Sequence, residues 1–74
     1  MEERILDVLK NVLELSSADT TICTKNCEAW DSMAQLNLMV ELETEFDVSF
    51  EPEEIAEMIS YDAIKAMLEK KGVK

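Results

Sequence analysis

The chain of 74 residues has no histidine, one glycine, one proline and only two cysteines. Without histidine it lacks the usual general base near neutral pH, the Ser-His and Cys-His nucleophile pairs and the HExxH zinc motif. The one glycine, Gly72, cannot build a glycine-rich phosphate loop, and it does not stand among the spaced acids of an EF-hand calcium loop. The sequence therefore predicts a protein that is not an enzyme and has no catalytic residues.

The two cysteines, Cys23 and Cys27, do not make a disulfide framework. Their C-x3-C spacing, with no histidine and no third cysteine, supplies too few ligands for a zinc site, so no metal is predicted. Reduced thiols favour a cytoplasmic protein. No uninterrupted apolar run exceeds three residues, and the acidic N-terminus has no apolar signal core. We therefore expect no membrane-spanning segment and a free-standing protein.

Acidic residues dominate the charge of the chain. Seventeen acids against seven bases give a net charge of −10, and eleven acids but no base lie between Asn26 and Ile64. Such a chain repels nucleic acid and anionic membranes, and it attracts partners with basic patches. A solvated face that keeps a small protein in solution explains the same pattern. Charge alone leaves these two interpretations open.

Apolar residues at three- and four-residue spacing predict four helices. The predicted elements are a helix from Glu3 to Leu15, a helix from Ser32 to Glu45 or Phe46, a short helix that starts at Pro52, and a last helix from a cap at Ser60 to a stop at Gly72. The expected fold is all-α, a small four-helix bundle of three main helices and a short third one. It should form a single domain over residues 1–74.

Three of the predicted segments have a distinctive distribution of apolar residues. Residues 16–28 show no sustained period, so we expect a long loop between the first two helices, anchored to the core by Ile22 and Trp30. The second helix has apolar residues around much of its circumference, more than one neighbour can cover. The short third helix should present an apolar side made of Ile55, Met58 and Ile59.

Asp31, Ser32 and Met33 stand where the long loop meets the second helix. Asp31 or Ser32 can cap this helix, and Ser32 with Gln35 fits an S-x-x-Q capping box. A serine at a helix N-terminus is also exposed, and a phosphate attached there meets free N–H groups and the positive end of the helix dipole. Local physics by itself favours the cap.

The surroundings of this serine favour the second interpretation. Trp30-Asp31-Ser32-Met33 is followed by an acidic, leucine-rich helix that ends in Glu43-Thr44-Glu45-Phe46-Asp47. This pattern closely resembles the acyl carrier protein family, in which Asp-Ser-Leu precedes an acidic helix ending in Glu-Glu-Phe. The resemblance continues through Glu53-Glu54 to the last helix and covers essentially the whole chain.

The resemblance implies an acyl-carrier-protein-like fold and a carrier function. In this family a phosphopantetheinyl transferase attaches 4′-phosphopantetheine from coenzyme A to the serine that Ser32 matches, within the motif of Asp31 and Met33. Acyl or aminoacyl groups are then carried as thioesters on the arm. The implied partners are the transferase and acyl-loading and acyl-using enzymes with basic docking patches, and the implied state is a monomer. The partner-facing residues would be Leu36, Asn37, Val40, Glu41 and Glu43.

Some of these assignments have alternatives. Core packing explains Leu36 and Val40 as well as partner binding does. Ala34 and Asn37 stand where carriers of fatty acid synthesis usually have acids, which favours a specialised pathway, such as a polyketide-like, polysaccharide-modifying or aminoacyl-loading one. The alternative to a carrier is a non-catalytic acidic helical interaction module, in which Ser32 is only a helix cap.

Overall fold

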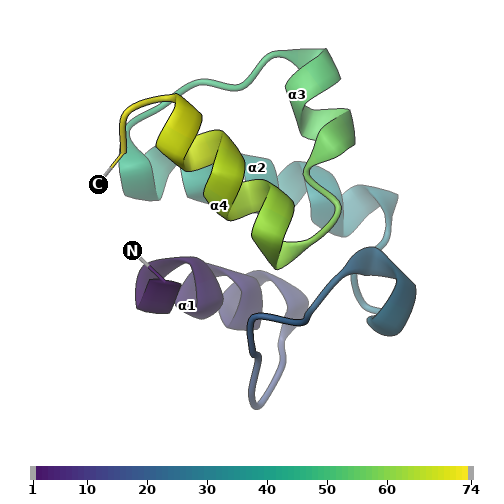
Figure 1. Cartoon of the computed structure of the whole chain (residues 1–74). Helices are drawn as coiled ribbons and strands as arrows, with labels where there is room; N and C mark the ends of the chain where they lie inside the picture. Colours follow the sequence, from purple (N-terminus) through teal and green to yellow (C-terminus); the bar gives the residue numbers. More distant parts are fainter. Residues whose placement is uncertain (1, 74) are drawn as a thin grey trace.

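The computed structural model describes residues 2–73. Over this range the chain forms four α-helices and one short 3-10 turn (Figure 1). The elements are α1 (Glu2–Leu13), η1 (Thr24–Asn26), α2 (Ser32–Phe46), α3 (Pro52–Glu57) and α4 (Tyr61–Lys70). The prediction of an all-α fold with four helices, the third of them short, is confirmed.

The first helix is shorter at its C-terminal end than predicted. Glu2 and Glu3 lie in its first turn and Lys10 in its last, an arrangement that the helix dipole favours. The expected end at Leu15 is wrong, because Glu14 adopts a left-handed φ of 55° and interrupts the helix after Leu13. Negative φ would be needed to continue the helix.

The other helix ends follow local chemistry closely. Asp47 closes α2 in the left-handed conformation, with φ of 54°, and its backbone N–H donates to the carbonyl of Glu43. Pro52 occupies the start of α3, as predicted. Ser60 caps α4 by accepting from the N–H of Ala63 at 3.1 Å, and Gly72 follows the helix with φ of 85°. The predicted roles of Pro52, Ser60 and Gly72 are confirmed.

The core is built mainly from one face each of α1, α2 and α4, and α1 packs against both of the others. Its buried helical residues are Ile5, Val8, Leu9, Leu13, Leu38, Met39, Leu42, Phe46, Tyr61, Ile64, Met67 and Leu68. The short α3 contributes differently from the prediction. The helix ends at Glu57, Met58 after it is fully buried, and Ile59 is 48% exposed. The expected apolar side that joined Ile59 to Ile55 and Met58 is therefore wrong at Ile59.

The long first connection is tied firmly to the rest of the molecule. Ile22 and Trp30 are both buried, which confirms them as anchors. The N–H of Thr24 donates to the carbonyl of Ile59, and the N–H of Tyr61 donates to the carbonyl of Ile22, both at 2.9 Å. These two bonds hold the loop against the connection between α3 and α4. They place η1 near the start of α2 (Figure 1).

Two ion pairs join other helices of the fold to one another. The Arg4 guanidinium donates to the Glu45 carboxylate at 2.9 Å and lies 4.5 Å from the centre of the Phe46 ring, which joins α1 to the end of α2. Lys71 pairs with Glu54 at 2.9 Å and joins the end of α4 to α3. The Glu51 N–H and then Lys71 hold the pKa of Glu54 below its ordinary value. The second pair thus helps to fix α3 in place.

Candidate functional site

Ser32 is the first residue of α2, and Asp31 is the residue that caps the helix. The Asp31 backbone is extended, and its carboxylate accepts the N–H of Ala34 at 2.9 Å. The predicted capping box between Ser32 and Gln35 is wrong, since Gln35 is engaged elsewhere. Of the two caps that the sequence allowed, the structure has Asp31. The exposed hydroxyl of Ser32 is therefore not used to cap the helix.

The first turn of α2 offers backbone donors beside this hydroxyl. Asp31 takes the N–H groups of Ala34 and Gln35 through its carboxylate and carbonyl oxygens. The N–H groups of Ser32 and Met33 stand earlier in the helix, where no intrahelical acceptor exists. The first turn also contains no acidic residue. Together with the positive end of the dipole, these donors suit a phosphate attached to Ser32.

Gln35 joins α2 to the end of α3. Its Oε1 accepts the indole N–H of Trp30, and its Nε2 donates to the carbonyl oxygens of Ile55 at 2.8 Å and Met58 at 3.0 Å. Sequence reasoning missed this role. Two signals could have found it: a buried tryptophan needs an acceptor for its N–H, and the last carbonyls of a short helix need donors.

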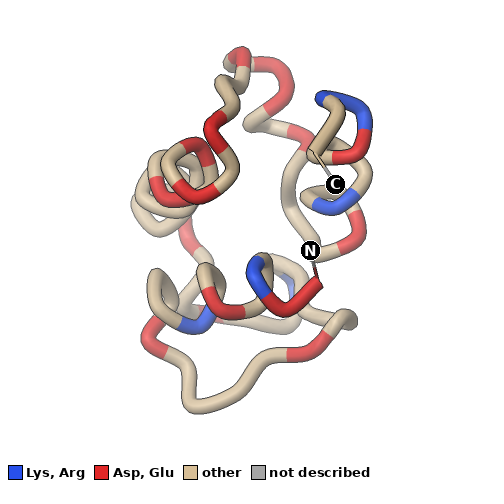
Figure 2. Tube along the Cα trace, turned by 90° about the vertical axis from the view of Figure 1, so that its left-hand side faces the viewer, with Lys and Arg blue, Asp and Glu red and all other residues tan. Residues whose placement is uncertain are grey.

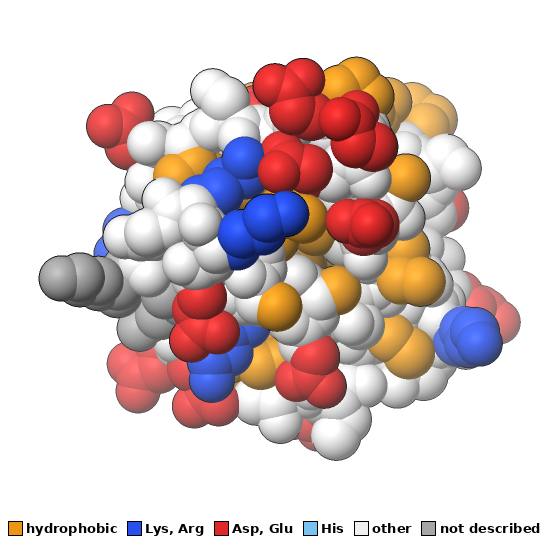
Figure 3. Space-filling model, turned by 45° about the horizontal axis from the view of Figure 1, so that its top comes forward, with side chains coloured by type: hydrophobic (Ala, Val, Ile, Leu, Met, Phe, Trp, Pro, Cys, Tyr) orange, Lys and Arg blue, Asp and Glu red, His pale blue; other side chains and the backbone are white. Residues whose placement is uncertain are grey.

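A pocket of about 330 Å³ opens directly beside Ser32. It lies between the start of α2 and the α3 segment, with η1 at its rim. Its lining combines apolar and polar side chains: Thr24, Trp30, Asp31, Ser32, Gln35, Ile55, Ala56 and Ile59. Figure 3 shows hydrophobic surface beside the acidic residues of α3. A group attached to Ser32 could therefore fold back onto an apolar wall.

One face of α2 carries large apolar side chains that nothing in residues 2–73 covers. Met33 is 76% exposed, Leu36 62% and Val40 58%. Their spacing places them along one side of the helix, and Asn37 and Glu41 on α2 are also exposed. Core packing therefore does not explain Leu36 and Val40. Their role in partner binding stays a prediction.

Glu43 follows Leu36 by seven residues and so lies on the same side of α2. Its side chain is half-buried, and its carboxylate accepts the backbone N–H of Phe50 at 2.9 Å. Its carbonyl also receives the N–H groups of Asp47 and Val48. This bond does not exclude a partner contact, so that role of Glu43 stays a prediction. Glu43 stabilises the turn that leads from α2 to α3.

The charge around the site is acidic. Figure 2 shows acidic residues on α2 and on the α3 segment, whereas the basic residues lie outside them.

Away from the site, burial and then the charge of Glu2 raise the pKa of Tyr61. No cluster of three or more Cys, Asp or Glu side chains in residues 2–73 is arranged to hold a metal ion. The site presents the exposed hydroxyl of Ser32 beside the carboxylate of Asp31.

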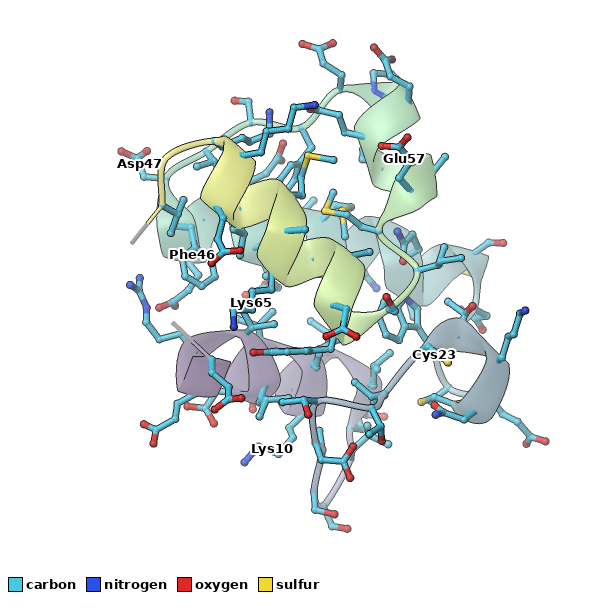
Figure 4. The ribbon with its side chains drawn as sticks, in the orientation of Figure 1. Lys10, Cys23, Phe46, Asp47, Glu57 and Lys65 are labelled. Atoms are coloured by element: carbon cyan, nitrogen blue, oxygen red, sulfur yellow. The ribbon has the colours of Figure 1, made fainter. Side chains whose placement is uncertain are left out.

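The two cysteines lie in the neighbouring loop as half-buried free thiols. Cys23 pairs with Ser60 through a single antiparallel bridge, next to the start of α4 (Figure 4). Within the described part of the chain, no helix combines the length and the apolar character that crossing a bilayer requires.

Three comparisons with known proteins complete the description. No protein-family model matches the chain, and no curated protein or solved structure matches it either. The features of the molecule that bear on function are Ser32, the pocket beside it and the exposed face of α2.

Proposed function

We propose that the chain is a carrier of the acyl carrier protein type, which holds acyl or aminoacyl groups as thioesters on a 4′-phosphopantetheine arm attached to Ser32. One observation carries the proposal. Ser32 is exposed at the start of a long helix, beside a partly apolar pocket, and Asp31 performs the capping that would otherwise explain a serine there. The four-helix fold and the sequence pattern around Ser32 agree with an acyl-carrier-like domain.

The residues around Ser32 fit the attachment of this arm. In the transfer, the Ser32 Oγ forms a bond to the phosphorus next to the pantetheine, and the pyrophosphate bond of coenzyme A breaks. The serine proton passes to a base of the transferase, and 3′,5′-ADP leaves. The N–H groups of Ser32 and Met33 and the helix dipole then stabilise the phosphodiester. Asp31 fixes the helix end and so presents the serine.

When attached, the arm supplies a thiol that carries the acyl group as a thioester. The chain itself needs no general acid or base, which agrees with its lack of histidine. Trp30, Ile55 and Ile59 offer the arm and its cargo an apolar surface beside Ser32. The cysteines need no part in this chemistry, and their free thiols agree with a cytoplasmic location.

The exposed face of α2 is proposed to contact the partner enzymes. Met33, Leu36 and Val40 supply apolar contact area, while Asn37 and Glu41 supply polar and acidic contacts. An exposed ion pair contributes only about 0–1 kcal/mol, so docking on a basic patch should be weak and salt-dependent. A shuttle that must release each enzyme requires such binding. Because Ala34 and Asn37 are not acidic, we propose enzymes of a specialised pathway as partners of a monomer.

The test is intact-protein mass spectrometry after incubation with coenzyme A, magnesium and a promiscuous phosphopantetheinyl transferase. The wild type should gain one phosphopantetheine, and Ser32→Ala should gain none. Ser49→Ala is the matched control, because Ser49 is another exposed serine, outside the helix start, and this variant should be modified like the wild type. No gain by the folded wild type, with a known carrier modified in the same tube, would contradict the proposal.

The same experiment separates the carrier from the acidic interaction module. Both use the exposed face of α2, but the module assigns Ser32 to the helix cap, and that role belongs to Asp31. If neither the wild type nor Ser32→Ala gained mass and basic proteins still bound α2, the module would be the better description.

A further inference from the structure

The pocket beside Ser32 is separated from the hydrophobic core by a hydrogen-bonded bracket. The bracket consists of Gln35, the Trp30 indole and the carbonyls of Ile55 and Met58. The Gln35 amide nitrogen donates to the carbonyls of Ile55 and Met58, and the amide oxygen accepts the Trp30 indole N–H. Trp30 and Met58 are themselves core residues, exposed by 4% and 0%. The bracket therefore spans α2 and α3 where the pocket meets the core.

A second set of bonds holds the opposite wall of the pocket. The Thr24 N–H donates to the Ile59 carbonyl, and the Tyr61 N–H to the Ile22 carbonyl, both at 2.9 Å. The segment after α3 is thus fixed to the first loop, while Gln35 fixes it to α2. Lys71 adds a third tie to α3 through Glu54. Separating α3 from α2 would disturb several of these contacts at once.

The pocket beside Ser32 is a small surface hollow. Its volume of about 330 Å³ is near the lower limit of ligand pockets. A long acyl chain that lay against it would keep most of its length in water unless the core opened to the chain.

We propose, on the basis of the carrier function above, that Gln35 closes the helical core to the cargo, so that this carrier holds small acyl or aminoacyl groups beside Ser32 and not long chains among its helices. A chain that passed into the core would displace the amide. The Trp30 N–H and the carbonyls of Ile55 and Met58 would then lose their partners in an apolar setting, which is unfavourable. A small cargo requires no such opening. Gln35 is therefore a specificity-determining residue.

The closure is tested on the intact protein with a series of attached acyl groups of increasing length. A promiscuous transferase loads Ser32 from acetyl-, butyryl-, octanoyl- and decanoyl-coenzyme A, and intact mass verifies each product. Melting temperature and the fluorescence of Trp30, the one tryptophan of the chain, are then measured. Gln35→Met removes the amide at similar length. Asn11→Met is the matched control, because Asn11 is an exposed amide on α1.

In the wild type and in Asn11→Met, the melting temperature should differ by less than about 3 °C between acetyl and decanoyl forms. This is the lower end of the shift of about 3–6 °C expected for one buried methylene. The Trp30 emission should stay constant along the series. In Gln35→Met, the melting temperature should rise with chain length by several times that amount, and the emission should shift.

Three results would count against these ideas, and they differ from one another. A progressive rise in the wild type would show that long chains enter the core, and it would overturn the closure while leaving the carrier function intact. If neither the melting temperature nor the Trp30 emission changed with acyl length in the wild type and in Gln35→Met, the role of Gln35 would be overturned. Failure of any loading on Ser32 would instead contradict the carrier function on which the closure rests.

Discussion

The two faces of α2 carry similar side chains in opposite surroundings. On the inner face, Leu38 and Leu42 are fully buried against the other helices. On the outer face, Leu36 and Val40 are 62% and 58% exposed. Exposed apolar residues are common singly, and a contiguous row of them is a feature that interaction surfaces share. Apolar side chains thus occur on both faces of α2. The positions of α1 and α4 decide which of these side chains are buried within the chain.

The two ends of α2 differ in a related way. At the C-terminal end, Arg4 donates to both the carboxylate and the carbonyl of Glu45, and it covers the Phe46 ring. At the N-terminal end, Asp31 and Gln35 take up the structural bonds and leave Ser32 exposed. The helix is fixed at both ends, and the Ser32 hydroxyl at the N-terminal end is left out of the cap.

The largest expected effect is on the inner face. Leu42→Ala should lower the free energy of unfolding by about 2–5 kcal/mol, because it removes a fully buried side chain and leaves a cavity. Urea denaturation followed by circular dichroism measures the change. A loss below 1 kcal/mol, on the order of a surface substitution, would mean that the inner face is not packed as described.

The next largest effect is expected at the N-terminal end of α2, where substitutions of Asp31 and Ser32 should differ in their cost to stability. Asp31→Ala should cost about 1 kcal/mol of stability, because it removes the cap of α2. Ser32→Ala should change stability by less than about 0.5 kcal/mol while abolishing covalent loading. Thermal unfolding of both variants checks this difference. If Ser32→Ala were the more destabilising of the two, Ser32 and not Asp31 would be the cap.

The outer face should respond through binding and not through stability. Leu36→Ala should change the free energy of unfolding by less than about 0.5 kcal/mol, because its side chain is largely exposed. It should slow modification by the transferase if this face docks partners. Initial rates of mass gain, compared with those of Thr20→Ala at an exposed position of the first loop, provide the measurement. An unchanged rate would argue against docking on the face that contains Leu36.

The smallest effect concerns the tie between α3 and α4. The folded-state pKa of Glu54 lies below its ordinary value of 4.5, chiefly through the Glu51 N–H and then Lys71. Its ionised form therefore adds stability above that pH, and this contribution disappears as the pH falls through the lower folded-state pKa. Glu54→Gln should show a smaller loss of melting temperature on acidification than the wild type. Glu53→Gln, an exposed neighbour, is the control and should behave like the wild type.

The sequence was informative wherever a local rule decides the outcome. The range of α2, the proline at the start of α3, the cap at Ser60 and the stop at Gly72 each depend on a few adjacent residues. The anchoring of the long loop by Ile22 and Trp30 also followed from isolated apolar residues in a polar stretch. Such features need no knowledge of distant contacts.

Where distant contacts decide, the sequence was not sufficient. Gln35 fits a capping box by spacing, but carbonyls twenty and more positions away take its amide. Glu43 has the pattern of an exposed acid, yet the N–H of Phe50 draws it inward. The first helix extends to Leu15 by periodicity alone, although Glu14 adopts a left-handed conformation.

The sequence by itself determined the helical elements, the acidic surface and a serine at the start of α2, because periodicity, charge and capping chemistry act over a few residues. Only the tertiary structure decided that Leu36 and Val40 stay exposed and that the Gln35 amide bonds to the carbonyls of Ile55 and Met58. These features depend on which groups from distant parts of the chain lie within hydrogen-bonding or packing distance. That proximity is a property of the assembled helices and not of any one of them.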